Sequence, residues 1–332
     1  MNIFDRGLKS IQRGRLIHNQ DLSYFYYNEL GVSCIINRLH SIVNKSYENA
    51  CFIGPMAHLF TNQIPKGFLG IKQLTVVDNN KQSLDLSLSN MSTTIKTSGL
   101  CMDEEKWVFP PNYFDLIINN LQLHWVNDVY KTGEKWLNSL KPDGTLIGTA
   151  LGGDTLQELR ISLSLAEQER EGGISTHVSP MLHITDVGQI LIRLNYKMIT
   201  ANADLNTFYF DDSFALMNFL QGIGENNASV MRRSMLGRDT FIAADAIYRS
   251  LFAEKSGKFE GKIPATFELV HYIGWKEHSS QRKPLGRGTK GVDIKTLAEE
   301  IDDSEMEHIE INDNDSGVNV TNIKGTGNKG GK

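Results

Sequence analysis

The chain has 332 residues, of which 40% are hydrophobic and 22% charged, and its formal net charge is −5. This length can bury one large core or two modest ones, and the acidic balance argues against a nucleic-acid partner. Cys34, Cys51 and Cys101 have no metal-binding or redox spacing. We therefore expect reduced cysteines that serve packing, without a disulfide framework.

No apolar run in the chain approaches the roughly 18 residues needed to span a bilayer. The start of the chain is basic. The first twenty residues carry Arg6, Lys9, Arg13 and Arg15 against one acid, Asp5. This charge resembles a mitochondrial presequence, but the segment is shorter and poorer in serine than is typical of one. We expect a basic surface helix that opens the folded domain.

Buried strand patterns alternate with helical patterns in the first half of the chain. Strands are predicted at 49–54, 74–78, 94–101, 113–120 and 141–150, and helices at 81–90 and 128–140. Strands separated by helices imply βαβ units and a mostly parallel sheet. The expected fold is therefore α/β and of the nucleotide-binding, doubly wound type.

The pattern changes after residue 152. Helices are predicted at 152–173, 212–224 and 238–254, and late strands at 195–210 and 265–278. Asp154 is the expected N-cap of the first of these helices. We predict one domain over residues 1–297, with a helical cap around 152–255, and a disordered tail over 298–332, where hydrophobicity is too low for a core.

Polar residues follow the predicted parallel strands. Gly54 follows the first strand, Asp78 closes the second, Asp103 follows the third, and Asn119 is near the end of the fourth. In doubly wound folds an acid in the position of Asp78 accepts hydrogen bonds from a cofactor ribose, and a later carboxylate can meet the adenine amino group. Each aspartate could instead cap a turn.

His124 and Trp125 come directly after the fourth predicted strand. Ligands of open α/β sheets bind beyond the carboxyl ends of the strands, so both side chains could face cofactor or substrate. The alternative is that Trp125 packs a loop and that His124 is solvated.

These pieces resemble the class I S-adenosylmethionine-dependent methyltransferases, whose Rossmann-like fold has a mostly parallel seven-stranded sheet. Longer motifs make the chain similar to the mitochondrial complex I assembly factor five family over residues 4 to about 285. They are "FDRGLKS", "LQLHWVNDV", "LKPDGTLIGTALGGDTLQELR", "SLAEQEREGG", "LGRDTFIAADAIYR" and "PATFELVHYIGWKEH".

The resemblance implies a mitochondrial matrix protein, peripheral to the inner membrane, that hydroxylates an arginine of an iron–sulfur subunit of complex I. It places Gly54, Asp78 and Asp103 at cofactor positions. The family signature contains Asp154, Glu158, Arg160, Glu169 and Arg170. Two other functions stay open: a non-catalytic assembly chaperone with this fold, and an S-adenosylmethionine-dependent methyltransferase.

The glycine-rich turn departs from the family pattern, because Met56 and His58 stand where glycines are expected. Glycine serves there by adopting positive φ and by letting the cofactor approach bare backbone. We therefore expect weak or lost S-adenosylmethionine binding. The His-x-Asp/Glu spacing of a non-heme iron site occurs only at His308, in the predicted tail, so no metal site is predicted.

Asp154 and Glu158 are four residues apart, which on a helix puts them on one face. Two carboxylates there could hold a substrate guanidinium by bidentate hydrogen bonds. They could equally belong to a solvated helix face with intrahelical pairs. The sequence leaves both interpretations open, and we take Asp154, Glu158 and His124 as the candidate catalytic residues.

Overall fold

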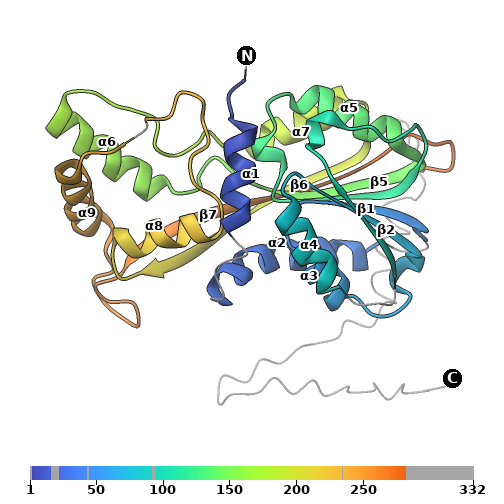
Figure 1. Ribbon diagram of the computed structural model, residues 1–332, viewed down its shortest axis with the longest axis horizontal. Helices are drawn as coiled ribbons and strands as arrows, with labels where there is room; N and C mark the ends of the chain where they lie inside the picture. Colours follow the sequence, from blue (N-terminus) through green and yellow to red (C-terminus); the bar gives the residue numbers. More distant parts are fainter. Residues whose placement is uncertain (1, 16–21, 43–44, 92–94, 234, 282–332) are drawn as a thin grey trace, which may run out of the picture. The chain divides into compact units, whose positions relative to one another are not determined.

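The computed structural model describes residues 2–15, 22–42, 45–91, 95–233 and 235–281 (Figure 1). The predicted tail and the motif at His308 lie outside these residues. The strands are β1 Asn49–Ile53, β2 Gln73–Asp78, β3 Lys96–Cys101, β4 Phe114–Asn120, β5 Leu140–Leu151, β6 Lys197–Phe210 and β7 Ile263–Trp275. The α-helices are α1 Arg6–Gly14, α2 Leu22–His40, α3 Ala57–Gln63, α4 Lys81–Ser89, α5 Val129–Ser139, α6 Gln157–Glu171, α7 Ile184–Arg193, α8 Ser213–Gly222 and α9 Arg238–Phe252. The short 3₁₀ helices are η2 Phe68–Gly70, η3 Glu104–Lys106 and η4 Leu123–Trp125.

All seven strands form one sheet in the order β3-β2-β1-β4-β5-β7-β6. The first five strands in the chain are parallel, whereas β7 runs antiparallel to both of its neighbours. This confirms the predicted Rossmann-like fold with a mostly parallel seven-stranded sheet. The strand order reverses between β1 and β4, and folds of this kind bind ligands beyond the carboxyl ends of the strands at that point.

Helices cover both faces of the sheet (Figure 1). On one face α2, α3 and α4 pack on alternate side chains of the parallel strands, such as Phe52 and Val76. On the other face α5 and α7 pack through Trp136 and Leu191. The strands are buried on both sides because each face carries a helical layer, and this explains their continuous apolar sequences.

A further apolar cluster lies where the antiparallel strands β6 and β7 extend past β5. Leu159 and Leu163 of α6 pack there with α8 and α9. Figure 1 shows these three helices gathered on the side of the molecule away from β1 and β2. The interval 152–255 also contains α7 and β6, which belong to the sheet layers, so the helices outside those layers are α6, α8 and α9.

Most predicted elements lie within a few residues of the observed ones, but α2, α3 and α7 were not predicted from the sequence. Among the described residues, no helix is both long enough and apolar enough to cross a membrane.

Candidate functional site

Gly54 forms the turn after β1. Its φ is +125°, and its N–H donates to the carbonyl of Val77 at the end of β2. A β-carbon at Gly54 would lie 2.4 Å from the carbonyl oxygen of Asn120. Only glycine therefore lets the ends of β1 and β4 approach this closely.

The structure confirms one expectation for this turn and corrects another. Met56 has φ +58°, as expected for a residue in a glycine position, and its side chain is buried. His58 lies inside α3, which begins at Ala57, and does not have positive φ. The expectation that His58 occupies a positive-φ glycine position is therefore wrong, because α3 starts earlier than the glycine pattern assumes.

Asp78 ends β2 and is buried. Its carboxylate accepts hydrogen bonds from the backbone N–H of Asn80 (2.9 Å) and from the hydroxyl of Ser83 (2.7 Å). Burial raises the pKa of Asp78, while the nearby Arg13 acts in the opposite direction. Asp78 thus stabilises the start of α4 and contributes a carboxylate to the carboxyl edge of the sheet.

Asp103 follows β3, which pairs with β2, and Asn119 lies near the end of β4, which pairs with β1. Asp103 caps η3, accepting from the N–H of Glu105, and it also accepts from Arg6 NH2 at 3.0 Å. Asn119 is fully buried, and its amide oxygen accepts from the hydroxyl of Tyr272. Asp103 therefore does act as a turn cap, the alternative that its sequence left open.

Helix α1 lies across this edge with its basic side inward. Lys9 and Arg13 are at most 2% exposed, whereas Ile11 is 63% exposed. Arg13 donates to the side chain of Asn79, and Ser10 donates to the carbonyl of the same residue. The helix was correctly predicted, but its assignment as a basic surface helix is wrong, because partners on the loops after β2, β3 and α8 compensate the buried cations.

Arg6 is held by a group of acids. Its guanidinium pairs with Asp103 and Glu104, approaches Glu105 at 4.0 Å, and donates to the carbonyl of Trp125. Burial by itself would lower the pKa of Arg6, but Glu104 and Asp103 raise it above its ordinary value. This guanidinium is permanently charged and joins α1 to the loop after β3.

Lys9 and Glu225 form a buried pair under α1. The ammonium group donates to the carbonyls of Gly224 and Asn226, lies 4.0 Å from the Glu225 carboxylate and stacks over the ring of Trp125. Burial would raise the pKa of Glu225, but Lys9 lowers it below its ordinary value. The carboxylate is therefore charged, and it also accepts from Trp125 Nε1 at 2.7 Å.

His124 is buried in the same cluster. The N–H of Leu151 donates to Nδ1 (3.1 Å), so the ring proton sits on Nε2, which faces Glu225 at 3.3 Å. Burial lowers the pKa of His124, which favours this neutral form. Both nitrogens are thus engaged within the protein, and the alternative of a solvated His124 is wrong.

Asp154 and Glu158 do not share a helix face. α6 begins at Gln157 after Leu156, which has positive φ, so Asp154 precedes the helix and is not its N-cap. Asp154 is exposed in the turn after β5, and its N–H donates to Glu268. Glu158 accepts from the hydroxyl and N–H of Thr266 on β7. The expected pairing fails because two glycines and Leu156 carry the chain through a turn before the helix starts.

Several buried polar atoms at this edge lack a hydrogen-bond partner among the described residues. They include both amide atoms of Gln122, Nδ2 of Asn120, NH2 of Arg13 and the hydroxyl of Tyr27. An unsatisfied buried polar group costs on the order of 1–3 kcal/mol. Such atoms beside Gly54 and Asp78 fit a polar ligand like S-adenosylmethionine, whose amino, carboxylate and ribose groups could pair with them.

The sequence did not reveal Lys9, Glu225 or Gln122 as parts of this site. One signal was available for the helix, since Arg6, Lys9 and Arg13 are spaced by three and four residues and so share one face. Glu225 gave no local signal, because its partners His124 and Trp125 are 101 and 100 residues away in the chain.

Three comparisons with known proteins bear on this site. The methyltransferase domain family matches residues 53–148, which span β1 to β5. The chain is 39% identical to the mitochondrial arginine-hydroxylase NDUFAF5 of Mus musculus, over 90% of this chain and 84% of that protein. It is 38% identical to the protein of the same name from Homo sapiens, with the same coverage.

Among solved structures, the YcgJ protein of Bacillus subtilis aligns with 74% of this chain and 98% of its own chain, at 12% identity and a TM-score of 0.48. The domain match and the observed sheet agree on a fold that binds S-adenosylmethionine in methyltransferases.

Proposed function

This chain belongs to the family of the mitochondrial arginine-hydroxylases, and we propose that it hydroxylates an arginine of an iron–sulfur subunit in the peripheral arm of complex I during assembly. The observation that carries the proposal is the 39% identity over 84% of the mouse protein, because the match extends well beyond the cofactor-binding half to the cap helices and to β7. We place the protein in the mitochondrial matrix, peripheral to the inner membrane.

Hydroxylation inserts one oxygen atom into a C–H bond of the arginine side chain. With dioxygen as the oxidant, the second oxygen atom leaves as water and a reductant supplies two electrons. The chain itself has to position the guanidinium. Asp154 is suited to this task because its carboxylate is exposed at the carboxyl end of β5, beside Glu268. A carboxylate can bind a guanidinium through two parallel hydrogen bonds.

Glu158 would act from the first turn of α6, whereas Asp154 lies in the turn before that helix. Its carboxylate accepts from Thr266, which fixes it at the junction of α6 and β7. His124 would position the site by holding the end of β5. Its neutral ring accepts from Leu151 at the end of β5 and contacts Glu225, so it orients the strand end from which Asp154 projects.

S-adenosylmethionine would bind beside Gly54, with Asp78 toward its ribose and Gln122 toward its amino-acid end. Asp103 after β3 and Asn119 at the end of β4 would contribute the other cofactor contacts. The cofactor supplies an electrophilic sulfonium in methyltransferases. We propose weak binding, because the buried Met56 side chain occupies the turn and α1 already hydrogen-bonds to the loop after Asp78. Calorimetric titration of the protein and of Asp78→Asn tests this. Tight binding of S-adenosylmethionine to the wild-type protein, left unchanged by Asp78→Asn, would contradict the proposed weak binding beside Asp78.

The decisive experiment is peptide mass spectrometry of the complex I peripheral arm from cells that lack this protein. We expect loss of one added oxygen on an arginine of an iron–sulfur subunit, and its return with the wild-type gene. The double variant Asp154→Asn, Glu158→Gln should fail to restore it, whereas Glu169→Gln, an exposed acid at the other end of α6, should restore it. Loss of assembly with the modification intact would support a non-catalytic chaperone instead.

A methyltransferase activity is the remaining alternative, and the domain match over residues 53–148 favours it. The same spectra decide between the two reactions. Loss of a methyl group from an assembly partner, with every arginine hydroxylation retained, would assign the chain to methyl transfer.

A further inference from the structure

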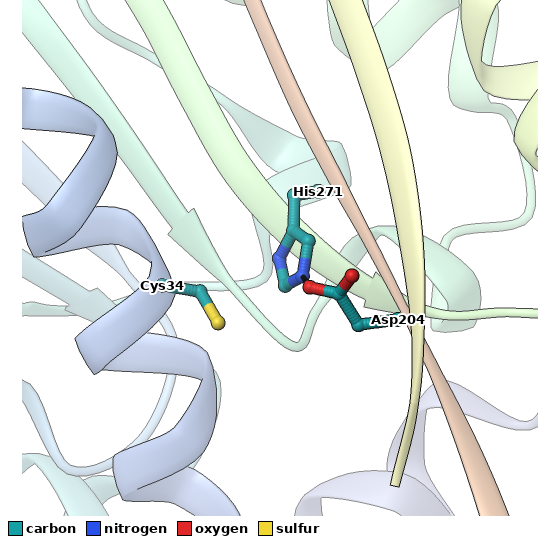
Figure 2. A group of neighbouring side chains, drawn as sticks. All are labelled: Cys34, Asp204 and His271. Atoms are coloured by element: carbon teal, nitrogen blue, oxygen red, sulfur yellow. Dashed lines mark hydrogen bonds and ion pairs between the residues drawn. The ribbon is translucent and has the colours of Figure 1, made fainter. Parts of the chain in front are cut away.

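Three potential metal ligands from distant parts of the chain meet on the sheet face covered by α2. They are Cys34 on α2, Asp204 on β6 and His271 on β7, and one ligand atom of each lies within 4.8 Å of the other two. Figure 2 shows the His271 ring between the Asp204 carboxylate and the helix that carries Cys34. This cluster could not be predicted from the sequence, because its members are separated by 170 and 67 residues.

His271 has an unused ring nitrogen in this cluster. Its Nε2 is 2.8 Å from the Asp204 carboxylate, and the side chain is only 2% exposed. Nδ1 is buried and has no hydrogen-bond partner among the described residues. Because the Asp204 carboxylate faces Nε2, an ion bound by both residues would take the place of the proton between them, and Nδ1 would keep the ring proton.

The cluster is accessible from one side. The Asp204 side chain is 65% exposed, while Cys34 is half-buried. An ion could therefore enter past Asp204, and water could complete its coordination shell.

We propose that Cys34, Asp204 and His271 bind a divalent first-row transition-metal ion, with water at the remaining position. Thiolate and imidazole ligands select against Mg²⁺ and Ca²⁺, which prefer oxygen. Three protein ligands with one open position are the pattern of a site that admits a further ligand. The ion would join α2 to the paired strands β6 and β7. This inference stands independently of the proposed hydroxylase function.

Cobalt(II) titration of the purified full-length chain under reducing conditions tests the site. We expect a thiolate-to-cobalt charge-transfer band that saturates at one ion per chain and that zinc(II) displaces. Cys34→Ser should abolish the band, and Asp204→Asn and His271→Gln should weaken cobalt binding at least tenfold. Cys101→Ala removes an exposed cysteine outside the cluster and should leave the titration unchanged.

Elemental analysis of the protein as purified gives a second measurement that does not depend on added cobalt. Circular dichroism of each variant checks that it is folded, and Asp204→Asn is the mildest change because that side chain is largely exposed. Absence of the charge-transfer band in the folded wild-type chain would overturn the proposal. So would a band that persists in Cys34→Ser or disappears in Cys101→Ala.

Discussion

Helices α1 and α6 are both rich in charged residues, yet they place their charges in opposite environments. In α1 the cations Lys9 and Arg13 are buried and the aliphatic Ile11 is exposed. In α6 the apolar residues Leu159 and Leu163 are buried, and Glu169 and Arg170 are exposed. The second arrangement is the usual amphipathic one.

The difference comes from what each helix packs against. α6 turns its aliphatic side chains toward the apolar cluster that it forms with α8, α9 and β7. α1 faces the carboxyl edge of the sheet, where Glu104, Glu225 and loop carbonyls accept hydrogen bonds or pair with its cations. A buried charge is tolerated only where such partners are fixed. The environment, and not the composition of the helix, decides which face is turned inward.

Replacing Lys9 should have the largest effect. In Lys9→Met the Glu225 carboxylate and two backbone carbonyls remain buried without their cation, and breaking a buried pair costs about 3–5 kcal/mol. Urea unfolding followed by circular dichroism measures this loss. The double variant Lys9→Met, Glu225→Leu should recover part of it. A Lys9→Met protein as stable as the wild type would show that the buried pair does not stabilise α1 on the sheet.

Equivalent aliphatic truncations in the two helices should separate them clearly. Leu163→Ala in α6 removes a buried side chain and should cost about 2–5 kcal/mol. Ile11→Ala in α1 removes an exposed one, and its effect should lie within about 0.5 kcal/mol. Denaturant midpoints of the two variants give the comparison. A loss of several kcal/mol in Ile11→Ala would mean that the basic face of α1 is not the buried one.

Glu167 is the exception in α6, and it should make stability depend on pH. Burial would raise its pKa, but hydrogen bonds from Ser175 and the charge of His177 lower it to about 2, from an ordinary 4.5. Because the folded pKa is depressed, this carboxylate stabilises the fold above about pH 4.5, and its contribution is lost as the pH falls toward 2. Glu167→Gln should therefore be destabilised at neutral pH and approach the wild type in acid. Thermal unfolding across this range measures the difference, and a constant difference at all pH values would contradict the assignment.

The sequence predicted the sheet well, because strands that are buried on both faces give short continuous apolar segments such as "LII" at residues 116–118. It also placed Gly54, Asp78, Asp103 and Asn119 on the strand ends that meet at the carboxyl edge. The sequence could not predict that α1 turns its cations inward. Glu225, the partner of Lys9, is 216 residues further along the chain. Nor could the sequence show that Leu156 at positive φ delays the start of α6 and removes Asp154 from the helix.

The smallest expected effect concerns Asp154. Since the residue precedes α6 and its exposed carboxylate does not cap the helix, Asp154→Asn should change the free energy of unfolding by less than about 0.5 kcal/mol. Asp128 is a matched control, because its side chain does cap α5 by accepting from the N–H of Lys131. Asp128→Ala should cost about 1 kcal/mol, as is typical for a lost N-cap. Urea unfolding of both variants beside Asp154→Ala makes the comparison direct. Equal losses for Asp154→Ala and Asp128→Ala would mean that Asp154 does cap α6 and serves to stabilise the helix. If Asp154→Asn is as stable as the wild type, the carboxylate of the wild-type residue is not needed for folding and is free to bind a substrate guanidinium.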